Sequence, residues 1–216
     1  MILLRVDAPY ASFRKSYARS FAETYPLPPP ATVYGMLLSL VGERFRARHQ
    51  GTRMALAFGG LPKIATTLRK LSRYKYGVPG KQSKLGNAPD FIETLCGIDF
   101  LCWLDSSEES ALGETLEERV VASIERPSSI TRYGVLSLGL SDDAVNDVRL
   151  CREPAGEWRR LVPSGEGNLE LPVWVDHVGA LGTRWQRYAL QERAEITLEP
   201  GHGSWPWTLI TPPTRD

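Results

Sequence analysis

The segment that decides the fold is residues 25–41, which read YPLPPPATVYGMLLSLV. The prolines stop any preceding element, and Pro30 can occupy the first turn of a helix, where no amide donor is needed. Apolar residues then recur at helical spacing, at Val33, Leu37, Leu40, Val41 and Phe45. We therefore predict a helix from Pro30 to about Arg48 that packs one face on a sheet.

The chain on either side of this helix predicts strands. Ile2, Leu4 and Val6 alternate with the residues between them, as in a strand buried on one face and ended by Pro9. Further strands are expected at 54–58, 91–103, 135–140 and 145–151, and a helix from a Ser106 or Ser107 cap to Ile124, with Leu112, Leu116, Val120 and Ile124 buried. This is the split βαβ order of an α+β, ferredoxin-like fold.

The part of the chain after Cys151 predicts a smaller unit. Short strand candidates at 158–162, 169–175, 185–190 and 195–198 are separated by Pro and Gly. We expect a first domain of residues 1–150 and a small β-rich C-terminal appendage of residues 151–216. Trp205 and Trp207, near the end of the chain, should pack against the body of the protein.

A long polar stretch, residues 63–88, contains no acidic residue. Its turn signal at 77–80 predicts an extended β-hairpin, covering about residues 63–89. Tyr74 and Tyr76 lie among its cations, which are Lys63, Arg69, Lys70, Arg73, Lys75, Lys81 and Lys84. Like charges at this density repel one another unless a polyanion lies close.

The formal net charge of +1 conceals a strong asymmetry. Residues 1–89 hold 15 basic and 3 acidic residues, whereas residues 90–216 hold 11 basic and 22 acidic residues. Such a split predicts one basic and one acidic surface, and the basic one is a candidate footprint for a polyanion. Two solvated faces without function remain the alternative interpretation.

Composition excludes several classes of protein. The three cysteines lack C-x-x-C spacing, and no run of apolar residues is long enough to span a membrane. With no secretory leader pattern, we expect a cytoplasmic protein without membrane contact. His49, His177 and His202 lack metal-ligand spacing, so neither a metal nor another cofactor is expected. His49 is the best candidate for acid–base chemistry, although a solvated helix end is the simpler interpretation.

Aromatic residues crowd the segment before the first helix. Six of them, Tyr10, Phe13, Tyr17, Phe21, Tyr25 and Tyr34, lie near Arg14, Lys15 and Arg19. Rings beside cations suit unpaired bases. We assign Phe13 and Phe21 to the core, and Tyr17 and Tyr25 to contacts with bases.

Two blocks of the sequence resemble a known family. The first comprises residues 8–14 (APYASFR), 24–37 (TYPLPPPATVYGML) and 40–42 (LVG), and the second comprises residues 132–141 (RYGVLSLGLS), followed by Val145 and Asn146. Together they resemble the CRISPR-associated Cas-five family, a subunit of Cascade and a member of the RAMP superfamily. The resemblance implies an RRM-like core from which the basic hairpin projects as a thumb.

The resemblance also implies a role in antiviral defence. Members of the family are non-catalytic RNA-binding subunits of the type I Cascade ribonucleoprotein complex. They bind the 5′ handle of the CRISPR RNA (crRNA), cap the backbone filament and help to seat the large subunit that reads the PAM. The expected partners are therefore the CRISPR RNA, the backbone subunit and the large subunit, with target DNA contacted only through the complex. The expected RNA-binding residues are Arg14, Lys15, Tyr17, Arg19, Tyr25, Tyr34, Gly35, Arg69, Lys70, Arg73, Lys75, Tyr76, Lys81, Lys84, Arg132 and Tyr133.

Two alternatives remain open from the sequence. One branch of the family cleaves repeat RNA without a metal, using a tyrosine with a lysine–histidine pair. The present chain has no Lys-His dipeptide, and only a convergence of Tyr34, His49 and Lys81 would supply those groups. The other alternative is a scaffolding protein that keeps the fold without binding RNA.

Overall fold

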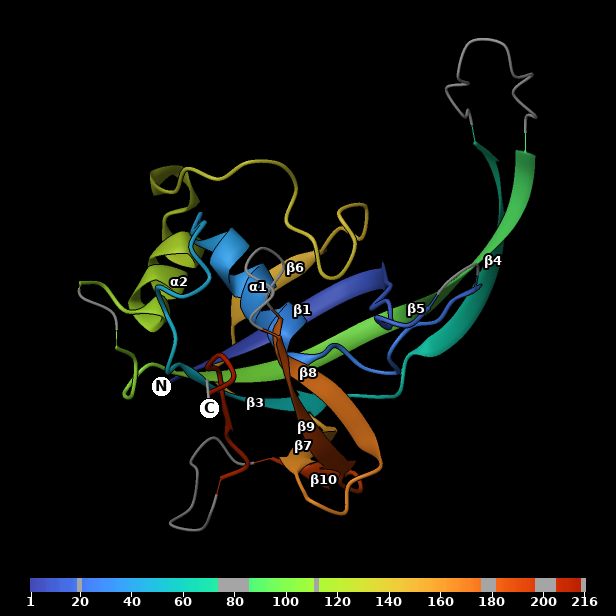
Figure 1. Cartoon of the computed structure of the whole chain (residues 1–216). Coiled ribbons are helices and arrows are strands. Elements are labelled where there is room, and N and C mark those ends of the chain that lie inside the picture. The colour runs from blue at the N-terminus through green and yellow to red at the C-terminus, as the bar shows by residue number, and fades with distance from the viewer. Residues whose placement is uncertain (19–20, 74–85, 111–112, 176–181, 197–204, 215–216) are drawn as a thin grey trace.

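The computed structural model describes residues 1–18, 21–73, 86–110, 113–175, 182–196 and 205–214 (Figure 1). Within them the chain forms, in order, β1 (Ile2–Ala11), β2 (Phe21–Ala22), α1 (Pro30–Leu40), β3 (Arg53–Phe58), β4 (Lys63–Arg73), β5 (Gly86–Asp105), α2 (Leu116–Glu125), the 3-10 turn η1 (Pro127–Ser129), β6 (Asp147–Leu150), β7 (Glu157–Pro163), β8 (Leu169–Val175), β9 (Thr183–Leu190), β10 (Ala194–Glu195) and β11 (Thr208–Leu209). The fold class is α+β.

One sheet runs through the molecule in the strand order β6-β1-β5-β3-β7-β9-β8. Its neighbouring strands along this path are antiparallel. Both helices lie on the same side of the central strands (Figure 1). Because β7 is paired with β3, the C-terminal strands extend the same sheet. The division into residues 1–150 and 151–216 stays a prediction.

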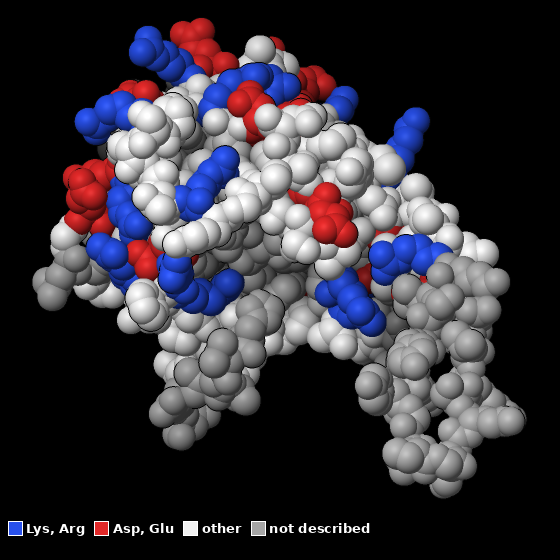
Figure 2. All heavy atoms as spheres, turned by 90° about the horizontal axis from the view of Figure 1, so that it is seen from above, with Lys and Arg blue, Asp and Glu red and all other residues white. Residues whose placement is uncertain are grey.

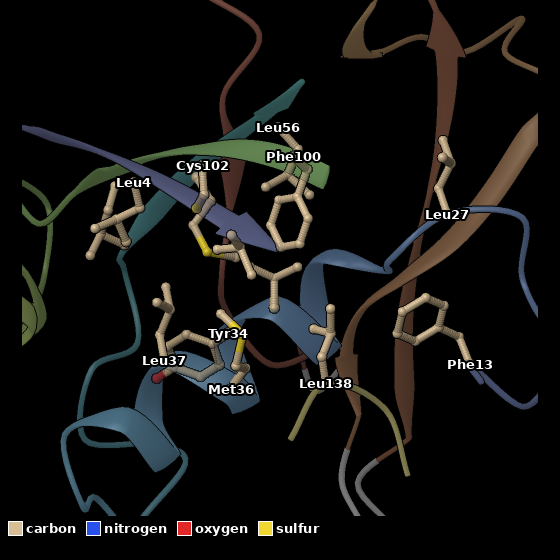
Figure 3. Close-up of a cluster of buried hydrophobic side chains, with 14 of the residues drawn as sticks. Leu4, Phe13, Leu27, Tyr34, Met36, Leu37, Leu56, Phe100, Cys102 and Leu138 are labelled. Atoms are coloured by element: carbon tan, nitrogen blue, oxygen red, sulfur yellow. The ribbon is translucent and has the colours of Figure 1, made fainter. Parts of the chain in front are cut away.

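The main hydrophobic core lies between α1 and the central strands (Figure 3). Tyr34 and Leu37 of α1 are fully buried, and Met36 is almost so. They share one cluster with side chains of three strands, which are Leu4 of β1, Leu56 of β3 and Phe100 and Cys102 of β5. Of the residues that the helical spacing predicted for this face, Val33, Leu37 and Val41 are buried, and Leu40 packs against the same cluster.

The opposite side of the sheet is covered by the end of the chain. Trp103 of β5 and Trp158 of β7 are buried there, and Trp205 and Trp207 pack against this second cluster. The rings of Trp103 and Trp205 meet edge to face, with centroids 5.4 Å apart. The predicted packing of the C-terminal tryptophans against the body is confirmed.

The first helix is shorter than predicted, because α1 ends at Leu40. Gly42 has a φ of 69°, and its amide donates to the carbonyl of Ser39. The amide of Glu43 donates to the carbonyl of Leu38, which completes a Schellman motif. The apolar spacing continued to Phe45, but this side chain is 74% exposed.

Two other predicted boundaries are wrong. β1 continues past Pro9 to Ala11, because its β6 partners end at Asp7 and the proline lies where that edge is unpaired. Helix α2 begins at Leu116 rather than after Ser107, since Thr115 and Glu118 form a capping box. In α2, Leu116 and Val120 are buried and Ile124 is partly buried, whereas Leu112 lies outside the described residues.

The predicted strand 135–140 is instead a loop. It makes a single bridge, between Ser137 and Ala144, and Gly139 adopts a φ of 107°. The buried carboxylate of Asp143 accepts hydrogen bonds from the amides of Ser12 (2.7 Å) and Leu140 (3.0 Å). The side chain of Asp143 therefore holds this loop against the end of β1. The alternation of apolar and polar residues that predicted a strand gives no sign of this contact.

The predicted hairpin has two long paired arms. β4 and β5 run antiparallel from the pair Lys63 and Cys96 to the pair Arg73 and Gly86, and they project away from the rest of the molecule (Figure 1). Among the described helices, none is long and apolar enough to cross a membrane.

Replacing Gly139 with alanine should destabilise the protein. A Cβ at this position would lie 2.7 Å from the carbonyl oxygen of Ser12, in addition to the strain of its positive φ. We expect the free energy of unfolding to fall by more than about 1 kcal/mol in a denaturant titration.

Gly134 provides the matched control. It also has a positive φ, but a Cβ there would meet no described atom within 4 Å. The Gly134→Ala variant should therefore show only the backbone strain. Equal losses in the two variants would contradict the close packing of Gly139 against β1.

Candidate RNA-binding interface

A groove of about 590 Å³ lies over α1. One wall is the loop after β1, with Ser12, Arg14 and Ser16, and another is the loop 137–140. The remaining lining includes Tyr25, Thr32, Gly35, Met36, Ser39, Arg46, Pro172, Val175, Thr183 and Trp185. Both blocks that carry the family resemblance therefore line the same groove.

The floor of the groove is the exposed side of α1. Gly35 lies in the middle of this helix, and a Cβ there would be 3.7 Å from Nη1 of Arg46, an ordinary contact. The guanidinium of Arg46 stacks near the rings of Tyr34 (5.4 Å) and Trp174 (5.2 Å). Its Nη2 donates to the carbonyl of Ala31 at 2.8 Å. Arg46 is thus held over the helix as a fixed positive charge in the lining.

A buried ion-pair network supports the loop that follows α1. The carboxylate of Glu43 accepts hydrogen bonds from the amides of Arg44 (3.0 Å) and Phe45 (2.9 Å). It also pairs with Arg119 of α2 (2.6 Å) and with Arg48 (3.0 Å). Burial alone would raise the pKa of Glu43, but the amide of Phe45 and the two arginines together lower it to about 2.

His49 belongs to the same network and is fully buried. Arg119 donates to its Nε2 at 2.7 Å, because a guanidinium group has no acceptor. The Nδ1 hydrogen is then donated to Glu109, which also accepts from Thr52 and from the amide of Leu116. Both ring nitrogens are engaged by the fold, so the predicted solvated helix end is wrong for this histidine.

The predicted aromatic contacts are distributed differently from our expectation. Tyr34 is fully buried and donates its hydroxyl to the carbonyl of Arg46 at 2.7 Å, so its ring is closed to bases. Tyr25 is only 8% exposed and packs near Trp185, with centroids 6.2 Å apart. Tyr17 is 65% exposed, as a base contact requires, whereas Phe21, which we assigned to the core, is 40% exposed.

The cations of the loop after β1 make local contacts. Arg14 donates to the carbonyl of Ala18 at 3.0 Å and lines the groove. Lys15 lies 5.7 Å from the centre of the Tyr17 ring and pairs with Glu23 at 3.4 Å. The hydrogen bond to Tyr17, followed by that to Glu23, raises the pKa of Lys15 above its ordinary value.

Of the remaining predicted residues, Arg69, Arg132 and Tyr133 have described side chains, and none of these lines the groove. Arg69 is on β4 and pairs with Asp90 across the hairpin at 3.7 Å. Lys70 and Arg73 are also on β4, but only their backbones are described. Arg132 and Tyr133 are exposed in the loop after η1. Arg19, Lys75, Tyr76, Lys81 and Lys84 lie outside the described residues.

Among the groove residues that sequence reasoning missed, Trp185 supplies a ring and Arg46 supplies a charge. Trp185 was read only as part of a strand, yet it is 39% exposed and faces the groove from β9. Arg46 was placed on the continuation of a helix that ends at Leu40. The Gly42 signal for the helix end could have identified Arg46 as a loop residue, whereas the position of Trp185 depends on the pairing of β8 and β9.

The predicted separation into a basic and an acidic surface does not hold on the face that Figure 2 shows. Figure 2 shows lysines and arginines in several groups with acidic residues among them. Strands of the basic half lie beside β5 of the acidic half, so Arg5 pairs with Asp99, and Arg53 pairs with Asp105 and Glu108. Strands from residues 1–89 and from residues 90–216 are neighbours in one sheet, so basic and acidic side chains lie side by side.

Comparison with known proteins shows the family to which this chain belongs. The family model described as CRISPR-associated protein (Cas_Cas5) matches residues 1–84. A CRISPR-associated protein Cas5 of Myxococcus xanthus (strain DK1622) is 45% identical over 195 residues, covering 89% of this chain and 91% of that protein. The chain therefore belongs to the CRISPR-associated Cas5 family.

Two solved structures share the fold. A chain described as a CRISPR RNA-guided surveillance complex has a TM-score of 0.60 at 14% identity and covers 93% of this chain and 94% of its own. A second, described as the crystal structure of a Cas protein, has a TM-score of 0.51 at 14% identity, covering 88% of this chain and 93% of its own.

The Glu43 network predicts an acid-labile protein. Because the folded state lowers the pKa of Glu43 from 4.5 to about 2, its stabilisation is present above pH 4.5 and is lost as the pH falls towards 2. The shift corresponds to a contribution on the order of 3 kcal/mol. Glu43→Gln should lower the free energy of unfolding at pH 7 and flatten its dependence between pH 4.5 and 2.

Glu125→Gln is the control for this measurement. Glu125 is exposed at the end of α2 and has no ion pair within the described residues. This variant should keep the pH dependence of the parent in denaturant titrations. A Glu43→Gln protein that follows the parent curve would show that the network does not contribute to stability.

Proposed function

We propose that this chain is a non-catalytic subunit of a type I CRISPR Cascade interference complex, and that its groove binds the 5′ handle of the CRISPR RNA. Within that complex, the protein caps the backbone filament and helps to seat the large subunit. The observation that carries this proposal is the meeting of the two family-like blocks around a groove lined by Arg14, Arg46 and aromatic rings. Cations beside rings suit the phosphates and unpaired bases of single-stranded RNA.

The core is, in this proposal, ferredoxin-like. The antiparallel order β6-β1-β5-β3, with α1 after β1 and α2 after β5, supports this assignment. RNA-binding domains of the RRM type stack bases on the open face of such a sheet. Here that face carries Trp103, Trp158 and the C-terminal tryptophans, so we assign RNA to the helical side instead.

The hairpin is proposed to act as a thumb beside the spacer. The loop after β1 is bonded to its base, because Ser12 Oγ donates to the carbonyl of Glu93 at 2.9 Å. The amide of Thr24 also donates to the Glu93 carboxylate at 3.0 Å. RNA leaving the groove on this side would therefore meet β4 and β5. Base pairing would read the target sequence, while the protein holds the RNA backbone.

The endoribonuclease alternative is less well supported. Tyr34 and His49 are both fully buried and bonded within the fold, so neither faces a phosphodiester. Lys81, the third group considered, lies outside the described residues. Specific cleavage of repeat RNA by the purified protein in EDTA would nevertheless overturn the non-catalytic assignment.

Substitutions of Gly35 test the groove. Gly35→Leu should fill its floor and lower the affinity for repeat-derived RNA at least about tenfold, because a large side chain occupies the path of the RNA. Gly35→Ala makes only an ordinary contact and should raise the free energy of unfolding by about 0.5 to 1 kcal/mol. Binding is measured by fluorescence anisotropy, and folding by circular dichroism.

Two outcomes would count against the groove. If a folded Gly35→Leu protein binds RNA as tightly as the parent, the groove is not part of the RNA-binding site. A parent protein that purifies free of nucleic acid, with a low ratio of absorbance at 260 to 280 nm, and binds no repeat RNA would favour the scaffolding alternative.

The salt dependence of RNA binding tests the hairpin. If about three of Arg69, Lys70, Arg73, Lys75, Lys81 and Lys84 contact phosphates, replacing all six with alanine should flatten the slope of log K against log salt by about 2. Each phosphate on single-stranded RNA contributes about 0.7 to that slope.

A variant with Arg149 and Arg152 replaced by alanine controls for lost positive charge, since both residues are exposed on or just after β6. It should keep the parent slope. If the variant with six alanines also keeps the parent slope, the hairpin does not contact phosphates, and the RNA contacts are limited to the groove.

A further inference from the structure

A second set of aromatic and basic side chains lies on the surface beyond the groove. Tyr133 is 76% exposed and Phe45 is 74% exposed, the two highest values among the large hydrophobic side chains that the structure describes. The guanidinium of Arg44 lies over the Tyr133 ring, 4.8 Å from its centre. We call Arg44, Phe45 and Tyr133 the ring platform.

The two segments that form the ring platform are held together by the backbone. A Cβ on Gly42 would lie 2.3 Å from the carbonyl oxygen of Thr131, so only glycine allows this approach. From this contact, residues 42–45 and 131–133 lead to the stacked pair of Arg44 and Tyr133. Figure 2 looks down on the side of the molecule where the loop after η1 crosses above α1 in Figure 1.

Buried charges fix the segment that carries Phe45. The Glu43 carboxylate accepts the amide hydrogens of both Arg44 and Phe45 and is itself only 4% exposed. Arg119 holds this carboxylate from α2, and His49 is bonded to the same arginine. The exposed Phe45 is therefore carried by a rigid loop. Because the loop is already ordered, less conformational entropy is lost when a ligand binds to it.

The charges around the ring platform favour a polyanion. Glu43, the acidic residue nearest in sequence to Arg44, is neutralised by Arg119 and Arg48. Arg132, next to Tyr133, has no ion pair within the described residues. Exposed rings with a stacked guanidinium and an available cation match the chemistry of unpaired bases on a phosphate backbone.

We infer that the ring platform is a second nucleotide-binding site, which stacks an unpaired base of single-stranded RNA on Tyr133 and Phe45 while Arg44 and Arg132 contact its phosphates. This inference rests on the proposed RNA-binding function and extends the RNA path beyond the groove. Because the site binds bases by stacking on their faces, it should bind RNA of any sequence.

The test uses the full chain and two probes, a short single-stranded RNA and an RNA of the same length with abasic sites. Phe45→Ala and Tyr133→Ala should each weaken binding to the base-bearing RNA about tenfold, as expected for the loss of one stacking contact. Their affinities for the abasic RNA should equal that of the parent. Arg44→Ala should weaken both, because it removes a charge.

Val135→Ala is the matched control, since Val135 is 69% exposed in the same loop but has no ring. It should bind both RNAs like the parent, and Tyr133→Phe should retain the parent affinity. Circular dichroism should show all variants folded, because the substituted side chains are exposed.

The outcomes separate this inference from the proposed function. If the parent binds RNA and Gly35→Leu does not, but the ring variants bind like the parent, the ring platform is wrong and the groove stands. If the ring variants keep RNA affinity but fail to assemble with the other subunits, the surface docks protein and the inference is overturned. A parent that binds no RNA would overturn both proposals.

Discussion

The rest of the structure depends on the continuity of β5. This 20-residue strand pairs with β1 along its second half, with β3 from Phe100 to Asp105, and with β4 from Gly86 to Cys96. Gly97, with a φ of 75°, lies between Cys96, the last residue paired with β4, and Phe100, the first residue paired with β3. The hairpin is therefore an extension of a core strand, and the loop that lines the groove is bonded to that same strand through Glu93.

Much of the fold could be predicted because it depends on local patterns. The alternation in β1, the prolines before α1 and the turn residues between β4 and β5 each report short-range backbone preferences. The helix ends that were predicted wrongly are set by single residues, and the apolar pattern gave no sign of them. Gly42 ends α1 although apolar spacing continues to Phe45, and Thr115 starts α2 although Ser107 is a good cap by itself.

The candidate site was less predictable, because it depends on contacts between distant segments. Tyr34 and Tyr17 look alike in the sequence, yet the first is buried under Arg46 and the second faces solvent. Asp143 gave no signal, although it joins the two blocks that line the groove. Counting charges along the chain also failed, since antiparallel pairing brings Arg53 of the basic half beside Asp105 of the acidic half.

The position of β11 has a consequence for the order in which the chain folds during synthesis. β11 pairs with Arg53 and Met54 of β3, and Arg53 also stacks on Trp207 at 5.4 Å. β3 is made early, but this part of its edge cannot be paired until residues 208–209 have left the ribosome. Pairings over such a separation form slowly, and an unpaired edge invites association with other strands. This part of the β3 edge is therefore open in a nascent chain from the time β3 is made until residues 208–209 emerge.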